Sequence, residues 1–256
     1  MGLRPGQSEA LGITILIAAV IVMAAAFMIY AMGNYGKSAA SSALAQVEAF
    51  MTNVADDIEA SMYMPGTVLV YPLPTSGYGS FNLLPGYCNV TIYTASGTIL
   101  SYLSGALIYG IPPSLISYTP GLVKVIRGSG EYGGPGAFST YVLNPSAPLI
   151  SILQFGYSRV NFGQSTVSYG TYLIMFPRVL IVSGGNTTYV YLPIFSIIQS
   201  AQRNSLVVNI SNISVVTMSG VSGLSLSNAC GQFKGSVSAS AQVLRLIVIN
   251  ITLTFR

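Results

Sequence analysis

The sequence predicts an α+β fold in which one long N-terminal α-helix precedes a C-terminal antiparallel β-sandwich, immunoglobulin-like but enlarged. Three observations predict it: an uncharged apolar stretch over residues 10–36, a helical periodicity that continues to residue 62, and short β-branched runs from residue 67 onward. We therefore expect an assembly or transmembrane helix over residues 7–64 and a β-sandwich head over residues 65–256.

The apolar stretch is long enough to cross a membrane. Residues 10–32 read ALGITILIAAVIVMAAAFMIYAM, and no charge follows before Lys37. A helix rises about 1.5 Å per residue, so this stretch spans the hydrocarbon core of a bilayer. A secretory signal peptide is the alternative interpretation, with residues 11–23 as its apolar core and the alanines at 24–26 as its cleavage region.

The helical pattern does not end with the apolar stretch. Apolar residues continue at spacings of three and four and form one stripe: Leu44, Val47, Met51, Val54, Ile58 and Met62. Acidic residues occupy the other faces, and Pro65-Gly66 is a stop signal. One helix from Ser8 to Ser61, about 80 Å long, follows. Its second half should pack against the head, whereas its first half needs lipid or other helices on every side.

After Pro65 the sequence consists of short β-branched and aromatic runs separated by Gly, Pro, Asn and Ser, which predict strands. Ten to twelve strands would make a sandwich larger than a seven-stranded domain. We expect the last run to be a central strand, buried on both faces, with one face against the helix. The clearest runs are residues 67–71, 90–93, 122–126, 172–176, 179–182, 189–192, 206–210 and 243–255.

Charge is scarce and unevenly distributed. Only 6% of the residues are charged and 52% are hydrophobic, so neutral polar residues must form most of the surface, as in proteins that pack against copies of themselves or carry glycans. Residues 1–65 contain two basic and five acidic residues, and residues 66–256 contain eight basic and one acidic residue. Scattered solvated cations are the simplest interpretation. Attraction between the two parts, or binding of anionic walls, lipids or DNA, are the alternatives.

The inventory of reactive side chains argues against an enzyme. The chain has no histidine, which removes Ser-His-Asp and Cys-His catalysis, and Glu131 is the only carboxylate side chain in the predicted head. The glycine-rich residues 128–136 lack the Lys-Ser/Thr ending of a phosphate loop. We therefore expect no catalytic site, no metal site and no cofactor.

Cys88 and Cys230 are the only cysteines, and no metal-binding or haem-binding motif surrounds them. A disulfide between them is the expectation for an exported protein, and two buried free thiols are the alternative. Five Asn-x-Ser/Thr sequences are candidate glycosylation sites: Asn89, Asn186, Asn209, Asn212 and Asn250.

The residues before the apolar stretch, Arg4-Pro5-Gly6-Gln7-Ser8-Glu9, resemble the leader junction of archaeal type IV prepilins. The resemblance implies that residues 1–6 are a leader, removed by a membrane prepilin peptidase between Gly6 and Gln7. It also implies that Glu9, close to the new N-terminus, pairs with the ammonium group of a neighbouring subunit. The leader is short, has one basic residue, and places the glutamate at mature position three rather than five.

In that family the apolar helices leave the membrane and form the core of a filament, and the β heads tile its outside. By this resemblance Leu11, Ile15, Ala18 and Val22 join Glu9 as assembly residues. The implied protein is a glycosylated subunit of an extracellular adhesion pilus, polymerised with itself by the pilus machinery, membrane-inserted before assembly, and in contact with cell or abiotic surfaces. The alternatives are an archaellum-type motility filament, a membrane-anchored monomeric surface protein, and a solute-binding or enzymatic head.

Overall fold

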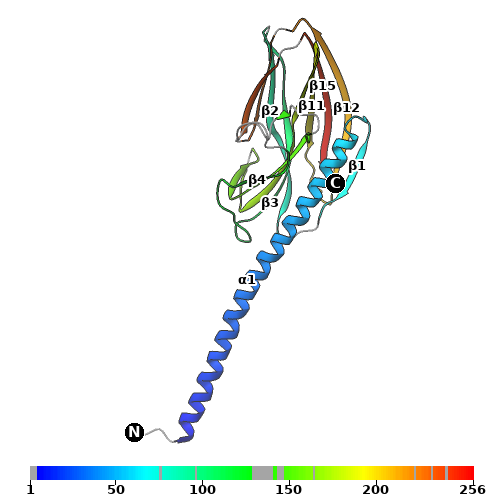
Figure 1. Cartoon of the computed structure of the whole chain (residues 1–256). Coiled ribbons are helices and arrows are strands. Elements are labelled where there is room, and N and C mark those ends of the chain that lie inside the picture. Colours follow the sequence, from blue (N-terminus) through cyan, green and yellow to red (C-terminus); the bar gives the residue numbers. More distant parts are fainter. Residues whose placement is uncertain are drawn as a thin grey trace.

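The structure is a computed structural model that describes residues 5–74, 77–95, 97–128, 141–142, 147–163, 165–221, 223–231, 233–239 and 242–256. One long helix projects from a β-rich head, and the N-terminal end lies far from the head (Figure 1). The predicted α+β fold class, a long N-terminal helix followed by a β-sandwich, is therefore confirmed.

The helix, α1, runs without interruption from Pro5 to Ser61. Its stripe from Leu44 to Met62 is buried in the head, as the spacing predicted, because residues three and four positions apart share one face of a helix. After the helix, a turn follows that includes Gly66, whose positive φ of 88° suits a residue without a side chain. The amide of Gly66 donates to the carbonyl of Ile210, which ties the end of the helix to the head.

The described residues of the head form two large sheets and one small hairpin. The six-stranded sheet has the order β1 (Val68–Pro72), β12 (Ser205–Ser219), β15 (Val243–Phe255), β11 (Thr187–Ile198), β10 (Val179–Gly184) and β5 (Tyr141–Val142). The seven-stranded sheet has the order β14 (Phe233–Ala239), β13 (Leu224–Cys230), β2 (Ser80–Thr94), β3 (Gly97–Ile111), β9 (Thr171–Pro177), β6 (Ile150–Phe155) and β4 (Val123–Arg127). The hairpin consists of β7 (Ser158–Asn161) and β8 (Thr166–Tyr169).

The sandwich departs from the purely antiparallel arrangement that we expected. The pairs β11–β15 and β10–β5 are parallel, so the six-stranded sheet is mixed, whereas the pairs of the seven-stranded sheet are antiparallel. The sequence of a single strand does not show its direction relative to its neighbours. Parallel and antiparallel pairing both give the same alternation of buried and exposed residues. All eight predicted runs nevertheless fall on strands.

The last strand, β15, is central, since it pairs with β12 on one side and with β11 on the other. It is not buried on both faces along its length, because exposed Arg245 lies between buried Leu244 and Leu246. The alternation shows that one face packs inward while parts of the other reach the surface.

Three apolar clusters hold the head together. The largest joins α1 to both sheets, and includes Met51, Ile58, Leu107, Phe195 and Ile251. A second lies between the sheets without α1, and a third covers the opposite face of the seven-stranded sheet, beneath the β7–β8 hairpin. The second half of α1 is thus part of the core of the head.

Candidate assembly surface

The first half of α1 is a bare apolar surface. Every residue from Gly12 to Tyr35 is exposed, and two predicted assembly residues, Ile15 and Val22, are 64% and 68% exposed. A helix that is hydrophobic on all faces is normally buried in lipid or among other helices, because its exposed side chains gain free energy on leaving water. This helix is long and apolar enough to cross a membrane by length and composition.

The predicted assembly residues fall on this surface as far as the structure describes them. Ile15, Ala18 and Val22 are exposed on the helix, while the side chains of Glu9 and Leu11 lie outside the described residues. The expected cleavage junction between Gly6 and Gln7 lies in the first turns of α1.

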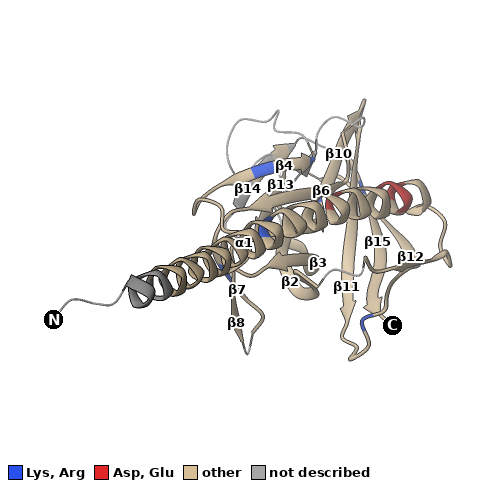
Figure 2. Ribbon diagram, turned by 90° about the horizontal axis from the view of Figure 1, so that it is seen from below, with Lys and Arg blue, Asp and Glu red and all other residues tan. Residues whose placement is uncertain are grey.

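Burial begins where the helix reaches the head, with Ala40 fully buried. From there to Met62 one face of the helix belongs to the core, and the other keeps its polar residues. Figure 2 shows that the acidic residues on the described part of the helix lie on this head-bound part. The helix therefore changes from a solvent-exposed surface to a core element within about one turn.

Ion pairs join the head-bound part of α1 to one edge of the seven-stranded sheet. Arg127 of β4 contacts the carboxylates of Asp56 and Glu59, with 3.0 Å between its nitrogen and Glu59 Oε1. Arg127 Nε also donates to the carbonyl of Ile150 at 3.2 Å, and the amide of Ile150 donates to Glu59 Oε1 at 2.7 Å. The Arg127 guanidinium and the Glu59 carboxylate therefore pair with each other, and both bond to the backbone of Ile150 in β6.

Two further contacts support this junction. Lys124 Nζ lies 3.7 Å from Glu48 Oε2, and the Tyr71 hydroxyl donates to Asp57 at 2.9 Å. Arg178 is buried nearby, where loss of solvent lowers its pKa to about 10 despite the opposing effect of Glu59. The charge imbalance between the two parts of the sequence thus leads to attraction within one chain for Lys124 and Arg127. The basic residues of the head are therefore not only scattered solvated cations.

The disulfide between Cys88 and Cys230 is present and joins paired residues of β2 and β13. It closes a loop of 142 residues, so it removes conformational freedom from the unfolded chain and restrains the start and end of the head. Among the described residues, no group of three His, Cys, Asp or Glu side chains could hold a metal ion.

Three of the five candidate glycosylation sites meet on one surface. In the ladder between β12 and β15, Asn212 lies opposite Asn250 and Asn209 lies opposite Thr252. Residues directly opposite share a face, and their Cβ atoms are about 5 Å apart. Val208 and Ile251, at alternate positions, point into the cluster that contains α1, so the three asparagines lie on the opposite face. The other two sites are exposed, Asn89 on β2 and Asn186 in the turn between β10 and β11.

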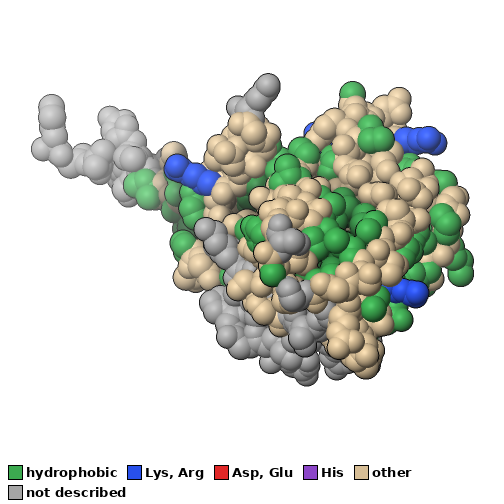
Figure 3. All heavy atoms as spheres, turned by 90° about the horizontal axis from the view of Figure 1, so that it is seen from above, with side chains coloured by type: hydrophobic (Ala, Val, Ile, Leu, Met, Phe, Trp, Pro, Cys, Tyr) green, Lys and Arg blue, Asp and Glu red, His purple; other side chains and the backbone are tan. Residues whose placement is uncertain are grey.

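The described part of the face that is seen in Figure 3 is largely neutral. Seen from the end away from the N-terminus, it is a mosaic of hydrophobic and uncharged polar side chains with a few cations (Figure 3). Such a surface suits close contact with other macromolecules more than free solution.

The chain matches no protein-family model, and neither the curated proteins nor the solved structures contain a significant match to it. The architecture, a long apolar N-terminal helix followed by a β-rich domain, is pilin-like in shape.

The contacts around Arg127 were not predicted from the sequence. Their signal was the excess of acidic residues in the helix and of basic residues in the head. That signal could not identify the pairs, because Arg127 and Asp56 are 71 residues apart in the sequence and only the fold brings them together.

Proposed function

We propose that this chain is the structural subunit of an extracellular filament of the archaeal type IV pilin kind, polymerised through the apolar half of α1. The observation that carries the proposal is the complete exposure of residues 12–35 on a continuous helix whose other half is part of the core of the head. Residues 12–35 thus form a rigid helical segment, the apolar rod, that exposes apolar side chains on all sides. Only partners outside the same chain can cover them.

The gain from covering this rod is large. Twelve large aliphatic, methionine and phenylalanine side chains are exposed on it, and burying each is worth about 1.5–3 kcal/mol, so full burial contributes roughly 20–35 kcal/mol before the entropy lost on association. Like helices packed around it would supply this burial without lipid. The twelve are Ile13, Ile15, Leu16, Ile17, Val20, Ile21, Val22, Met23, Phe27, Met28, Ile29 and Met32.

The proposal includes processing at the N-terminus. A prepilin peptidase removes residues 1–6, so that the mature chain begins at Gln7, and Glu9 pairs with the ammonium group of a neighbouring subunit. A carboxylate surrounded by apolar helices is costly without a partner, which favours the register that provides one. The N-terminal sequence of the purified subunit tests this directly.

The same features support a proposal for the location of the protein. The apolar helix favours insertion into a membrane before assembly, and the disulfide favours a compartment outside the cytoplasm. We propose that the pilus machinery moves the subunit into the filament, that glycans modify the head, and that the filament attaches to cell or abiotic surfaces. Its role is structural rather than catalytic.

The test is a charge placed in the apolar rod. Ala18→Glu puts a carboxylate on the exposed helix, and we expect it to abolish filaments in material sheared from cells, viewed by electron microscopy. Asn53→Glu is the matched control, because it adds the same charge at an exposed polar position on the head-bound half. Formation of the Cys88–Cys230 disulfide in both variants shows that the head still folds. Normal filaments from Ala18→Glu would overturn the proposal.

A membrane-anchored monomer is the second candidate, because the same apolar rod fits a bilayer core. In that case sheared material contains no filaments of this chain, and the protein stays with the membrane fraction until detergent releases it. The two candidates therefore give opposite results in one fractionation experiment.

A further inference from the structure

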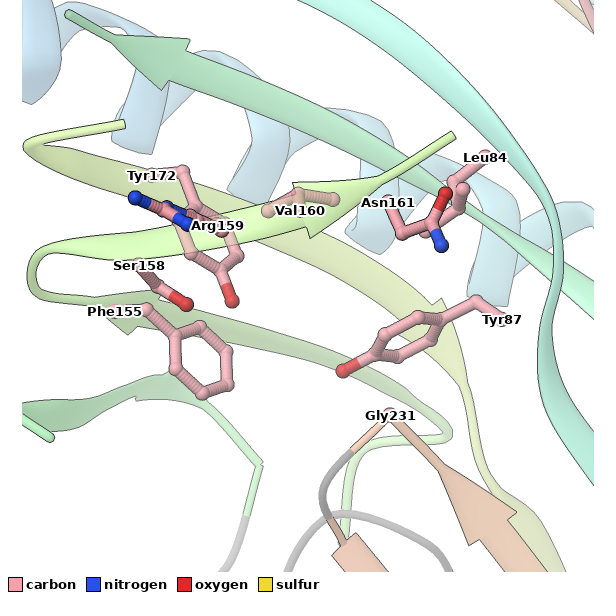
Figure 4. Close-up of a pocket in the computed structure, with 9 residues that line it drawn as sticks. All are labelled: Leu84, Tyr87, Phe155, Ser158, Arg159, Val160, Asn161, Tyr172 and Gly231. Atoms are coloured by element: carbon pink, nitrogen blue, oxygen red, sulfur yellow. The ribbon is translucent and has the colours of Figure 1, made fainter. Parts of the chain in front are cut away.

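A small hollow lies on the side of the head turned away from α1. It is bounded by the β7–β8 hairpin, the irregular part of β2 and the end of β13, and has a volume of about 280 Å³. Leu84, Phe155 and Tyr172 belong to the apolar cluster on the face of the seven-stranded sheet opposite the one that contacts α1. Figure 4 shows the helix behind this sheet, so α1 does not cover the hollow.

Aromatic side chains form the walls. Phe155 and Tyr172 are stacked, with their ring centres 4.8 Å apart and an angle of 10° between the rings. Tyr87 faces them from the irregular part of β2, and Gly231 lies against its ring. A Cβ atom at Gly231 would come within 2.8 Å of the Tyr87 hydroxyl, and this residue also has a positive φ of 56°. The absence of a side chain at Gly231 therefore leaves room for the Tyr87 ring at this place.

Polar groups face the space between the walls. The Tyr87 hydroxyl points into it (Figure 4). Asn161 Oδ1 accepts a bond from the amide of Gly163 at 2.8 Å, which fixes the side-chain amide and leaves its nitrogen at the hollow. Ser158 bonds to Tyr172 at the other end.

Among the described residues that line this site, one is a cation and none is an anion. Arg159 is exposed on β7, whereas the other lining residues are uncharged. The site thus combines an apolar wall, two neutral donor groups and a guanidinium, which matches a sugar ring with an apolar C–H face, a rim of hydroxyls and one carboxylate. The volume suits one ring rather than a longer chain.

We propose that this hollow binds a single hexuronic acid residue of an acidic surface polysaccharide. Arg159 pairs with the carboxylate, the Asn161 amide nitrogen and the Tyr87 hydroxyl bond to the ring hydroxyls, and Phe155 with Tyr172 contacts the C–H face. This deepens the proposed attachment to cell surfaces by naming a ligand class. Binding by the head does not depend on polymerisation, so its failure and a failure to form filaments are separate results.

The experiment uses the full chain in detergent, titrated with trigalacturonic acid and followed by saturation-transfer NMR and calorimetry, with maltotriose as the neutral comparison. We expect binding of the acidic trisaccharide and about tenfold weaker binding in Arg159→Gln, because a charge-assisted bond to the carboxylate is lost. Tyr87→Phe, which removes only one hydroxyl, should weaken binding a few-fold. Arg256→Gln removes the same charge outside the hollow and should leave binding unchanged.

Three results would overturn the proposal. The first is no binding of trigalacturonic acid at about 10 mM, a concentration that detects even very weak complexes. The second is an equal loss in Arg159→Gln and Arg256→Gln, which means attraction to overall charge rather than a site. The third is equal binding of maltotriose, which removes the assignment to an acidic sugar.

Discussion

Replacing Arg127 with methionine should loosen the attachment of α1 to the head. The Arg127 side chain is only 13% exposed and contacts Asp56, Glu59 and the carbonyl of Ile150. Methionine keeps an apolar stem of similar length but removes every one of these polar contacts. Glu59 then keeps the amide of Ile150 as a partner and loses its cation.

The size of the effect follows from the burial of the partners. Removing one partner of a buried ion pair costs about 3–5 kcal/mol, because the remaining charge is left uncompensated. Asp56 is 57% exposed and can be solvated, whereas Glu59 is 23% exposed. We therefore expect a loss of about 3 kcal/mol in the free energy of unfolding, the lower end of that range.

The assay is urea unfolding of the full chain in detergent, followed by the near-ultraviolet circular dichroism of its tyrosines. Lys124→Met is the control, because the Lys124–Glu48 pair is longer, at 3.7 Å, and its lysine is 56% exposed. Exposed pairs contribute at most about 1 kcal/mol. Equal losses in the two variants, or a loss below about 0.5 kcal/mol in Arg127→Met, would refute the reasoning, since typical surface substitutions lie in that range. A double variant with Glu59→Gln should lose much less than the two single losses combined.

Four other outcomes are expected. Replacing Cys88 and Cys230 with alanine should lower the free energy of unfolding by about 5 kcal/mol, because the disulfide closes a 142-residue loop. A urea-unfolding midpoint that reductant leaves unchanged in the natural sequence would contradict this. Tyr102→Phe should stabilise the head by about 1 kcal/mol in the same assay, because the buried hydroxyl has no hydrogen-bond partner among the described residues. Burial also raises the pKa of the Tyr102 hydroxyl above 10, so the unfolded chain ionises first and the free energy of unfolding falls as the pH rises above 10. Tyr102→Phe should reduce this alkaline fall. Glycans at Asn212 and Asn250 should be mutually exclusive on single molecules by intact mass spectrometry, because the two side chains lie directly opposite each other; frequent double occupancy would show that they do not interfere.

The helix was predictable because its signals are local. Spacings of three and four place Val47, Met51, Val54 and Ile58 on one face, and the structure buries all four. Residues 97–111, which form β3, were not among the clearest predicted strand runs. Glycines within β3 look like turn signals in the sequence, yet Gly105 and Gly110 are inside the strand.

Gly105 and Gly110 allow close packing between elements that are far apart in the sequence. A Cβ atom at Gly105 would collide with Ile197, and one at Gly110 would collide with the ring of Tyr169. Propensity cannot separate a glycine that permits a turn from a glycine that admits a neighbouring side chain. The parallel pairing of β11 with β15 and the contacts of Arg127 were unpredictable for a similar reason, because both depend on how distant segments meet.

The geometry of the head also connects the scarcity of charge to the proposed filament. If the apolar halves of α1 gather at the filament axis, the faces that pack on α1 turn inward and the opposite faces turn outward. Asn209, Asn212 and Asn250 lie on one outward face and the hollow at Tyr87 on another. Glycans on the asparagines would then provide the hydration that 6% charged residues cannot, while leaving the hollow accessible. Removing the three sequons with Asn→Gln should consequently make sheared filaments bundle laterally without lowering the affinity for the acidic trisaccharide, and filaments that remain dispersed would show that the neutral protein surface alone keeps them apart.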